Sequence, residues 1–199
     1  MLALAAALLA PSPAVADEDA VPAEELPAAL RPVDGSYLHL MGAAAVGRGL
    51  RFNNPYRLAT PLGDDAESLS LSASYLDFGF GAALGDPNGF QHGGSLHLSL
   101  ALQGIPQQVV TPSYLLVRRL PPYFLAFARA GLPVVIEPDL NLGYELAVGG
   151  AWLASAGLGV TAELVGDVFY GAATQDEALT VIPMLSLQLG LFVDYEVLP

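Results

Sequence analysis

The chain has 199 residues, a formal net charge of −13, and neither Lys nor Cys. The acidic balance argues against nucleic acid as a partner, because phosphate binding requires a basic face, and the lack of Cys excludes disulfides and thiolate chemistry. Hydrophobic residues make up 53% of the chain and are accompanied by 21 Gly and 16 Pro. No internal stretch reaches the roughly 18 uncharged apolar residues of a membrane helix. This composition is instead typical of a membrane barrel, in which apolar residues are spread over alternating strands.

The start of the chain differs from the rest. Residues 2–10 form an unbroken apolar run, and the small residues Ala14 and Ala16 follow it. This pattern is typical of a secretory signal peptide at residues 1–16, although the usual basic start is missing. A short buried helix is the alternative. Residues 17–35 are rich in Ala, Pro and acidic residues and predict a flexible periplasmic leader.

Eight segments of the remaining chain alternate apolar and polar residues, as strands with two different faces do. A slip of the alternation between Tyr75 and Leu76 predicts a β-bulge in the second segment. Since eight is an even number, we expect an all-β fold, an eight-stranded antiparallel up-and-down transmembrane β-barrel over residues 36–198. The segments lie at residues 36–47, 67–81, 94–104, 109–119, 123–132, 140–150, 157–170 and 181–197.

The links between these segments fit a barrel with both termini in the periplasm. The longest link, residues 48–66, then falls outside the cell, and two of the three periplasmic links are short, as in known barrels. The exceptions are a long periplasmic link at 82–93 and a short outer link at 105–108. Aromatic residues near the segment ends would form girdles at the membrane interfaces. They are Tyr37, Tyr123, Trp152, Tyr170 and Tyr195.

The last segment carries the most specific motif. Gln188 is followed by Gly190 and then by the hydrophobic residues Val193 and Tyr195. This order resembles the C-terminal insertion signal that the barrel-assembly machinery reads on the final strand of Gram-negative outer-membrane proteins, although four residues follow the aromatic one here. The chain is thereby similar to the small outer-membrane barrels of the OmpA, OmpX and OmpW kind. The resemblance implies a monomer in the bacterial outer membrane, surrounded by membrane lipid and lipopolysaccharide.

The same resemblance implies structural anchoring, adhesion or a narrow, porin-like channel as the usual roles. We therefore expect a non-enzymatic barrel with a structural or narrow-channel role and a polar lumen filled by side chains. No catalytic, cofactor-binding or metal-binding residue is assigned. Two alternatives remain open. One is a lipid A-modifying enzyme of the deacylase type. The other is a secreted soluble ligand-binding barrel of the lipocalin type, which would have its apolar faces inside.

Inside a narrow barrel, the negative charge of acidic residues on the polar faces must be balanced by nearby cations. Arg129 is placed inward, because the opposite face of its segment is apolar. Either Arg118 or Arg119 is expected to join it, since the alternation of segment 109–119 leaves the frame open. An ion path or gate is the alternative role of these charges. The predicted lumen charge network comprises Asp77, Arg129, Glu145, Glu163, Asp167 and Asp194.

His97 and Ser99 lie two residues apart on one segment, as the catalytic His and Ser of lipid A deacylases do. The alternation places both on the inner face, whereas those enzymes work from the lipid face, and the wider motif around their His is missing. Two small polar lumen residues are the favoured interpretation. His39 and His97 could both face inward, but no ligand spacing indicates a metal site.

Overall fold

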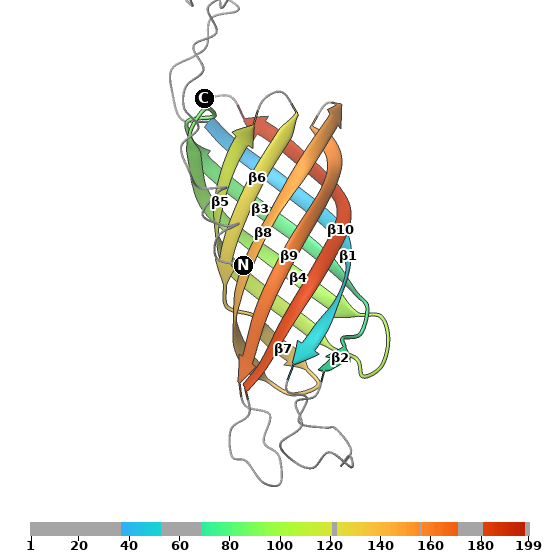
Figure 1. The fold of residues 1–199 in the computed structure, drawn as a ribbon. Coiled ribbons are helices and arrows are strands. Elements are labelled where there is room, and N and C mark those ends of the chain that lie inside the picture. Colours follow the sequence, from blue (N-terminus) through green and yellow to red (C-terminus); the bar gives the residue numbers. More distant parts are fainter. Residues whose placement is uncertain (1–36, 53–68, 121–122, 156, 171–180, 198–199) are drawn as a thin grey trace, which may run out of the picture. The chain divides into compact units, whose positions relative to one another are not determined.

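The computed structural model describes residues 37–52, 69–120, 123–155, 157–170 and 181–197 (Figure 1). The expected signal peptide and leader lie outside these residues. The described part contains no helix of the length and apolarity that a membrane crossing requires. Its strands are β1 (Tyr37–Phe52), β2 (Leu69–Leu71), β3 (Tyr75–Gly85), β4 (Phe90–Ala101), β5 (Gln108–Leu120), β6 (Phe124–Gly131), β7 (Val134–Glu137), β8 (Asn141–Ser155), β9 (Leu158–Tyr170) and β10 (Val181–Val197).

The strands close into a barrel. They run in the order β10-β9-β8-β6-β5-β4-β3-β1, every pairing is antiparallel, and β1 also pairs with β10 from Leu38–Val197 to Arg51–Met184. The short strand β7 pairs with β5 and β8 beyond the end of β6, and β2 pairs only with the end of β1. Figure 1 shows the long strands tilted around one axis. The expected eight-stranded antiparallel barrel is confirmed.

Several strands are longer than the alternation predicted. The expected link at 82–93 is wrong, because β3 continues to Gly85 and β4 begins at Phe90. The remaining turn is tight, and Asp86 accepts hydrogen bonds from the backbone N–H groups of Asn88 (2.8 Å) and Gly89 (3.0 Å). The links expected at 133–139 and 151–156 likewise contain β7 and the end of β8. Small residues hide the alternation at the ends of β3 and β8, whereas the backbone ladder does not depend on side chains.

The expected β-bulge at Tyr75 is also wrong, since the strand is interrupted at residues 72–74, between β2 and β3. Leu71 points outward, whereas Tyr75 lines the interior, so the interruption changes the phase of the alternation. Ser72 bridges the gap, because its backbone N–H donates to the Gly49 carbonyl and its hydroxyl accepts from the Gly49 N–H, both at 2.8 Å.

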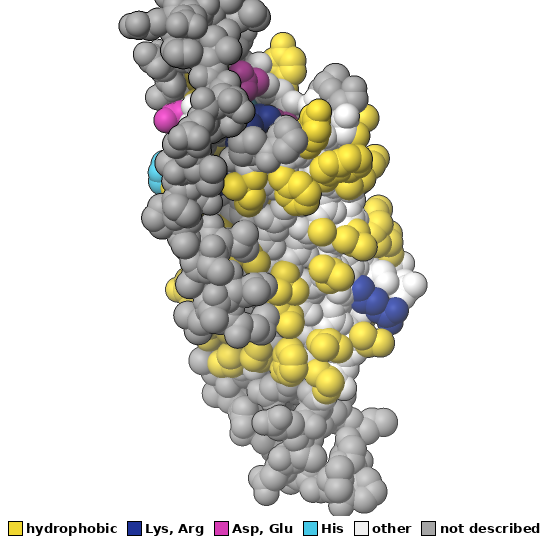
Figure 2. Space-filling view, turned by 45° about the horizontal axis from the view of Figure 1, so that its top comes forward, with side chains coloured by type: hydrophobic (Ala, Val, Ile, Leu, Met, Phe, Trp, Pro, Cys, Tyr) yellow, Lys and Arg dark blue, Asp and Glu magenta, His cyan; other side chains and the backbone are white. Residues whose placement is uncertain are grey.

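The two faces of the barrel differ sharply. Large hydrophobic side chains cover the outer surface, among them Leu40, Phe80, Leu146 and Leu191, and they spread over the outside of the strands in Figure 2. The side chains that face inward include most of the buried charged groups of the described strands. This polarity is that of a transmembrane barrel, whose lipid-facing band is apolar. It is the reverse of a soluble lipocalin-type barrel, so that alternative is wrong.

Four of the five aromatic residues expected at the membrane interfaces lie on the outer surface: Tyr123, Trp152, Tyr170 and Tyr195. Tyr37 is the exception, because its side chain is buried and only 8% exposed. It shares the inward face of β1 with the buried residues His39 and Met41, as the alternation of that strand requires. The proposed girdle therefore does not include Tyr37.

Candidate functional site

The lumen holds the charged residues, and its centre is organised around Arg129 on β6. The Arg129 guanidinium binds Glu145 on β8 and Glu163 on β9, with 2.5 Å from Nε to the Glu163 Oε1. All three side chains are buried, and Arg129 is only 3% exposed. The strand register explains the contact between Arg129 and Glu145, because Arg129 lies opposite Ala147, which is two residues from Glu145. One buried cation is thus shared by two carboxylates.

A second cluster joins β3 and β4. Asp77 accepts hydrogen bonds from His97 Nδ1 at 2.8 Å and from the Ser99 hydroxyl at 2.6 Å, and Asp77 and Ser99 are direct cross-strand partners. Gly79 makes room for the imidazole, since a Cβ atom at this glycine would lie 2.6 Å from the His97 ring. Ser99 therefore binds the carboxylate and not the imidazole, whereas the nucleophile of a Ser-His-Asp triad is hydrogen-bonded to the His.

A third cluster lies near the start of β1 and the end of β10. Asp194 on β10 contacts His39 Nδ1 at 3.0 Å and receives a hydrogen bond from Arg119, which reaches it from β5. The frame of β5 is thereby settled, since Arg119 faces the lumen. Arg118 points the other way, and its guanidinium carbon lies 5.1 Å from the centre of the Phe90 ring. Five of the six charges predicted for the lumen network thus lie in these three clusters, and the sixth, Asp167, lies directly opposite Glu145.

An apolar layer occupies the lumen between the Asp194 and Arg129 clusters. Phe192 lies two residues before Asp194 on the inward face of β10 and stacks on Phe127, with 6.2 Å between ring centres. The expected polar lumen is therefore interrupted, and the sequence signal for this is Phe192 itself, which breaks the polar face of its strand. Phe192 packs in a buried cluster with Met41, Ala83, Leu115, Val117, Leu125, Ala151 and Leu153.

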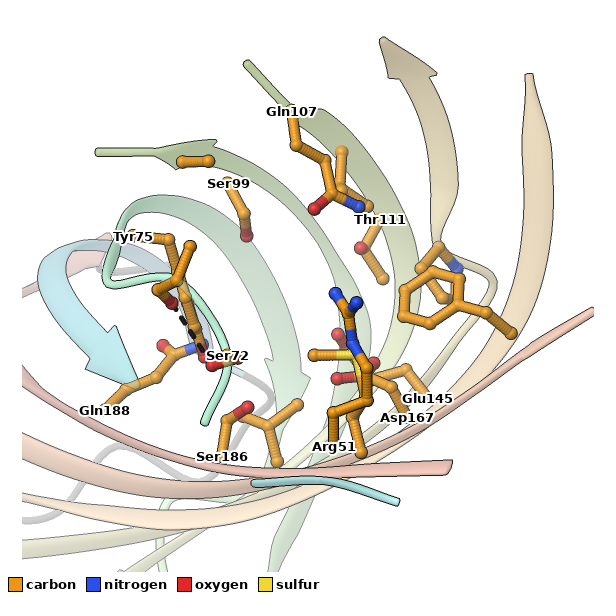
Figure 3. Close-up of a pocket in the computed structure, with 17 residues that line it drawn as sticks. Arg51, Ser72, Tyr75, Ser99, Gln107, Thr111, Glu145, Asp167, Ser186 and Gln188 are labelled. Atoms are coloured by element: carbon orange, nitrogen blue, oxygen red, sulfur yellow. Dashed lines mark hydrogen bonds between the residues drawn. The ribbon is translucent and has the colours of Figure 1, made fainter. Parts of the chain in front are cut away.

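A cavity opens at the end of the barrel where β1 ends and β10 begins, and Figure 3 shows its lining side chains. Its empty volume is about 640 Å³ including the open solvent at its mouth. Tyr75 and Gln188 meet on one wall, where the Gln188 amide donates to the Tyr75 hydroxyl at 3.2 Å. Glu145 and Asp167 lie on another wall as direct cross-strand partners, and Arg51 extends into the same space. Basic, acidic and neutral polar side chains thus surround this cavity.

The residues of the predicted insertion signal lie on β10. Val193 and Tyr195 point outward and are 47% and 67% exposed, so they face the membrane side. Gln188 points inward to Tyr75, and Gly190 packs so closely on β1 that a Cβ atom there would lie 2.2 Å from the Ala44 carbonyl oxygen. Recognition of this strand by the assembly machinery stays a prediction.

Sequence reasoning missed several residues of the lumen. The glycines before Arg51 end the visible alternation and predict a link there, whereas β1 continues to Phe52. Phe127 was overlooked because its own segment is apolar on both faces except at Arg129. Within the described residues, no group of three or more His, Asp or Glu side chains is arranged to hold a metal ion.

Comparisons with known proteins give no family. No family model matches the chain, and no curated protein matches it either. Among solved structures, the chain is similar to Neisserial surface protein A, with 10% identity over 81% of this chain and 100% of that one and a TM-score of 0.49. It is also similar to a de novo designed transmembrane β-barrel, with 8% identity over 76% of this chain and 95% of that one and a TM-score of 0.36. No residue role is carried over from either protein.

Proposed function

We propose that the chain is a non-enzymatic protein of the bacterial outer membrane, and that its barrel is a rigid structural element closed to the passage of solutes. One observation carries this proposal. The stacked rings of Phe127 and Phe192 lie in an apolar layer between two charged clusters of the lumen. An ion crossing this layer would lose its water shell without gaining a polar partner, which is costly. The layer therefore favours the structural role over the channel.

The apolar outer face of the barrel indicates which molecules would surround it. Lipid and lipopolysaccharide would contact the apolar band, and the chain would act as a monomer after the barrel-assembly machinery has inserted it. The start of β1 and the end of β10 lie side by side, since Leu38 is paired with Val197. In the orientation of known outer-membrane barrels, this end faces the periplasm, and the cavity beside Arg51 opens to the outside.

The contacts of His97 and Ser99 support a structural role over lipid A chemistry. Both side chains bind Asp77 in the lumen, and the Ser99 hydroxyl donates to the carboxylate. A hydroxyl held in this way is not hydrogen-bonded to the His97 imidazole, and it lies on the face opposite to lipid. Ser99→Ala and His97→Ala should therefore leave the acylation pattern of lipid A unchanged in mass spectra of the cells. A changed pattern in a variant that still folds would assign the enzyme instead.

The membrane location is tested by cell fractionation combined with gel mobility. The chain should be found in the outer-membrane fraction and should migrate differently before and after boiling, because a closed barrel resists detergent until it is heated. A chain recovered only in the soluble fraction would contradict the proposal.

A further inference from the structure

We propose that the cavity at the end of the barrel where β1 ends and β10 begins binds a small zwitterion of the free α-amino acid class. Its carboxylate would bind the Arg51 guanidinium, and its ammonium group would bind the Asp167 carboxylate. This assignment goes beyond the structural role, since a barrel closed by its apolar layer can still hold a ligand at one end.

The strand register places these two residues in one row of the inner wall. Arg51 on β1 lies opposite Met184 on β10, and Met184 lies opposite Asp167 on β9. Neighbouring strands are roughly 5 Å apart, so the two backbones are separated by about 10 Å. Both side chains line the cavity, as Figure 3 shows, and yet they form no ion pair with each other.

The cationic side of the site is unsatisfied within the described strands. The Arg51 side chain has no hydrogen bond or ion pair with another described residue, and its Nε atom is buried without a partner. Buried donors are normally bonded, so this guanidinium has capacity for an anion. A carboxylate is a suitable acceptor, because it matches the geometry of the guanidinium N–H groups.

The anionic side holds more carboxyl groups than its own cation pairs with. Arg129 binds Glu145 and Glu163, and Asp167 lies directly opposite Glu145, so three carboxylates gather near one guanidinium. None of the ion pairs among the described residues joins Asp167 to a cation. A bound ammonium group would give Asp167 a cationic partner, whereas a second anion would be repelled by these carboxyl groups.

The two halves together select a zwitterion. A simple anion would bind Arg51 but face the carboxylates, and a simple cation would bind Asp167 but face the guanidinium. Polar hydroxyl groups and apolar side chains complete the lining, so a ligand with an apolar side chain, such as L-leucine, fits its chemistry. The apolar lining includes Val109, Pro133, Val165 and Phe169.

Calorimetry on the full chain folded in detergent tests the proposal with three probes. L-leucine carries both charges, isopentylamine lacks the carboxylate, and isocaproate lacks the ammonium group. We expect L-leucine to bind at least about tenfold more tightly than either analogue, since each analogue loses a charge-assisted contact. This comparison uses the unchanged chain and does not depend on the folding of any variant.

Two variants then assign the ends of the ligand. Arg51→Gln should remove the advantage of L-leucine over isopentylamine, and Asp167→Asn should remove its advantage over isocaproate. Arg48→Gln is the matched control, because Arg48 lies on the same strand but is exposed on the outer face. Gel mobility before boiling establishes that each variant is folded.

Three results would overturn the proposal. The first is the absence of any heat of binding up to the solubility limit of L-leucine, as expected if Arg51 and Asp167 close on each other in solution. The second is equal affinity for L-leucine and isocaproate, which would indicate a simple anion site. The third is unchanged L-leucine binding in folded Arg51→Gln and Asp167→Asn variants.

Discussion

Phe127 and Phe192 stack across the lumen, with 6.2 Å between their ring centres and 6° between their planes. They belong to β6 and β10, which are not neighbours in the sheet, so the contact spans the interior of the barrel. On one side of this pair Arg119 binds Asp194, and on the other side Arg129 binds Glu145 and Glu163. The lumen is therefore divided into charged parts by an apolar layer.

Removing Arg129 should destabilise the barrel strongly. Arg129→Ala leaves Glu145 and Glu163 buried without their cation, and breaking a buried ion pair costs about 3–5 kcal/mol, less where water enters the lumen. Urea unfolding in lipid vesicles measures the loss.

Two further variants test this explanation. The triple variant with Glu145→Gln and Glu163→Gln should recover part of the lost stability, because it removes the unpaired charges. Arg48→Ala, on the outer face, serves as the control. Equal stability of the Arg129→Ala variant and the unchanged chain would mean that the ion pairs do not hold the barrel together.

The outward and inward faces of the strands can be checked with single Cys labels. Cys at Leu96, Leu142 or Leu191 should react with a probe dissolved in the lipid phase, because these side chains are exposed on the outer face. Cys at Ser95 or Ser186 should not react, since both residues face the interior. The reverse pattern of labelling would place the apolar faces inside and refute the membrane barrel.

Assembly should depend on the outward residues of the last strand. The double variant with Val193→Asp and Tyr195→Asp removes the hydrophobic positions of the predicted insertion signal, and we expect it to be absent from the outer membrane. Acidic residues on a lipid face cost less than the roughly 2–4 kcal/mol of Arg or Lys at the midplane, so failed recognition should outweigh lost stability. Immunoblots of membrane fractions measure the amount of the variant in the outer membrane.

A matched variant separates recognition from stability. Leu142→Asp with Leu146→Asp also places two acids on the outer face, but on β8, away from the signal. It should reach the outer membrane at higher levels than the β10 variant. Equal levels of the two variants, or normal levels of the β10 variant, would show that these positions are not read as a signal.

Much of the fold could be predicted from the sequence, because side chains alternate across a strand with a period of two. This rule places His97, Glu145 and Asp194 inside and Leu96 and Tyr195 outside, as the structure has them. The rule can be applied without knowing the register of the strands or how the barrel closes. The same rule fails where small residues carry no alternation, which is why Arg51 and the ends of β3 and β8 were assigned to links.

The contacts across the lumen could not be predicted in this way. Which residues meet there depends on the stagger with which the sheet closes, and a single strand contains no information on it. Arg119 reaches Asp194 from β5, and Phe127 reaches Phe192 from β6, over several intervening strands. The choice between Arg118 and Arg119 stays open in the sequence for a different reason, because the alternation of segment 109–119 does not show which of its faces points into the lumen.

The conductance of the purified protein in planar lipid bilayers tests the closed lumen most directly. The unchanged chain should pass no measurable ion current, whereas the double variant with Phe127→Ala and Phe192→Ala should produce discrete conductance steps, because it removes both stacked rings. A variant with Phe78→Ala and Phe80→Ala, which changes two exposed rings on the outer face, should stay silent like the unchanged chain. Steady conductance steps from the unchanged chain would contradict the account and indicate a channel.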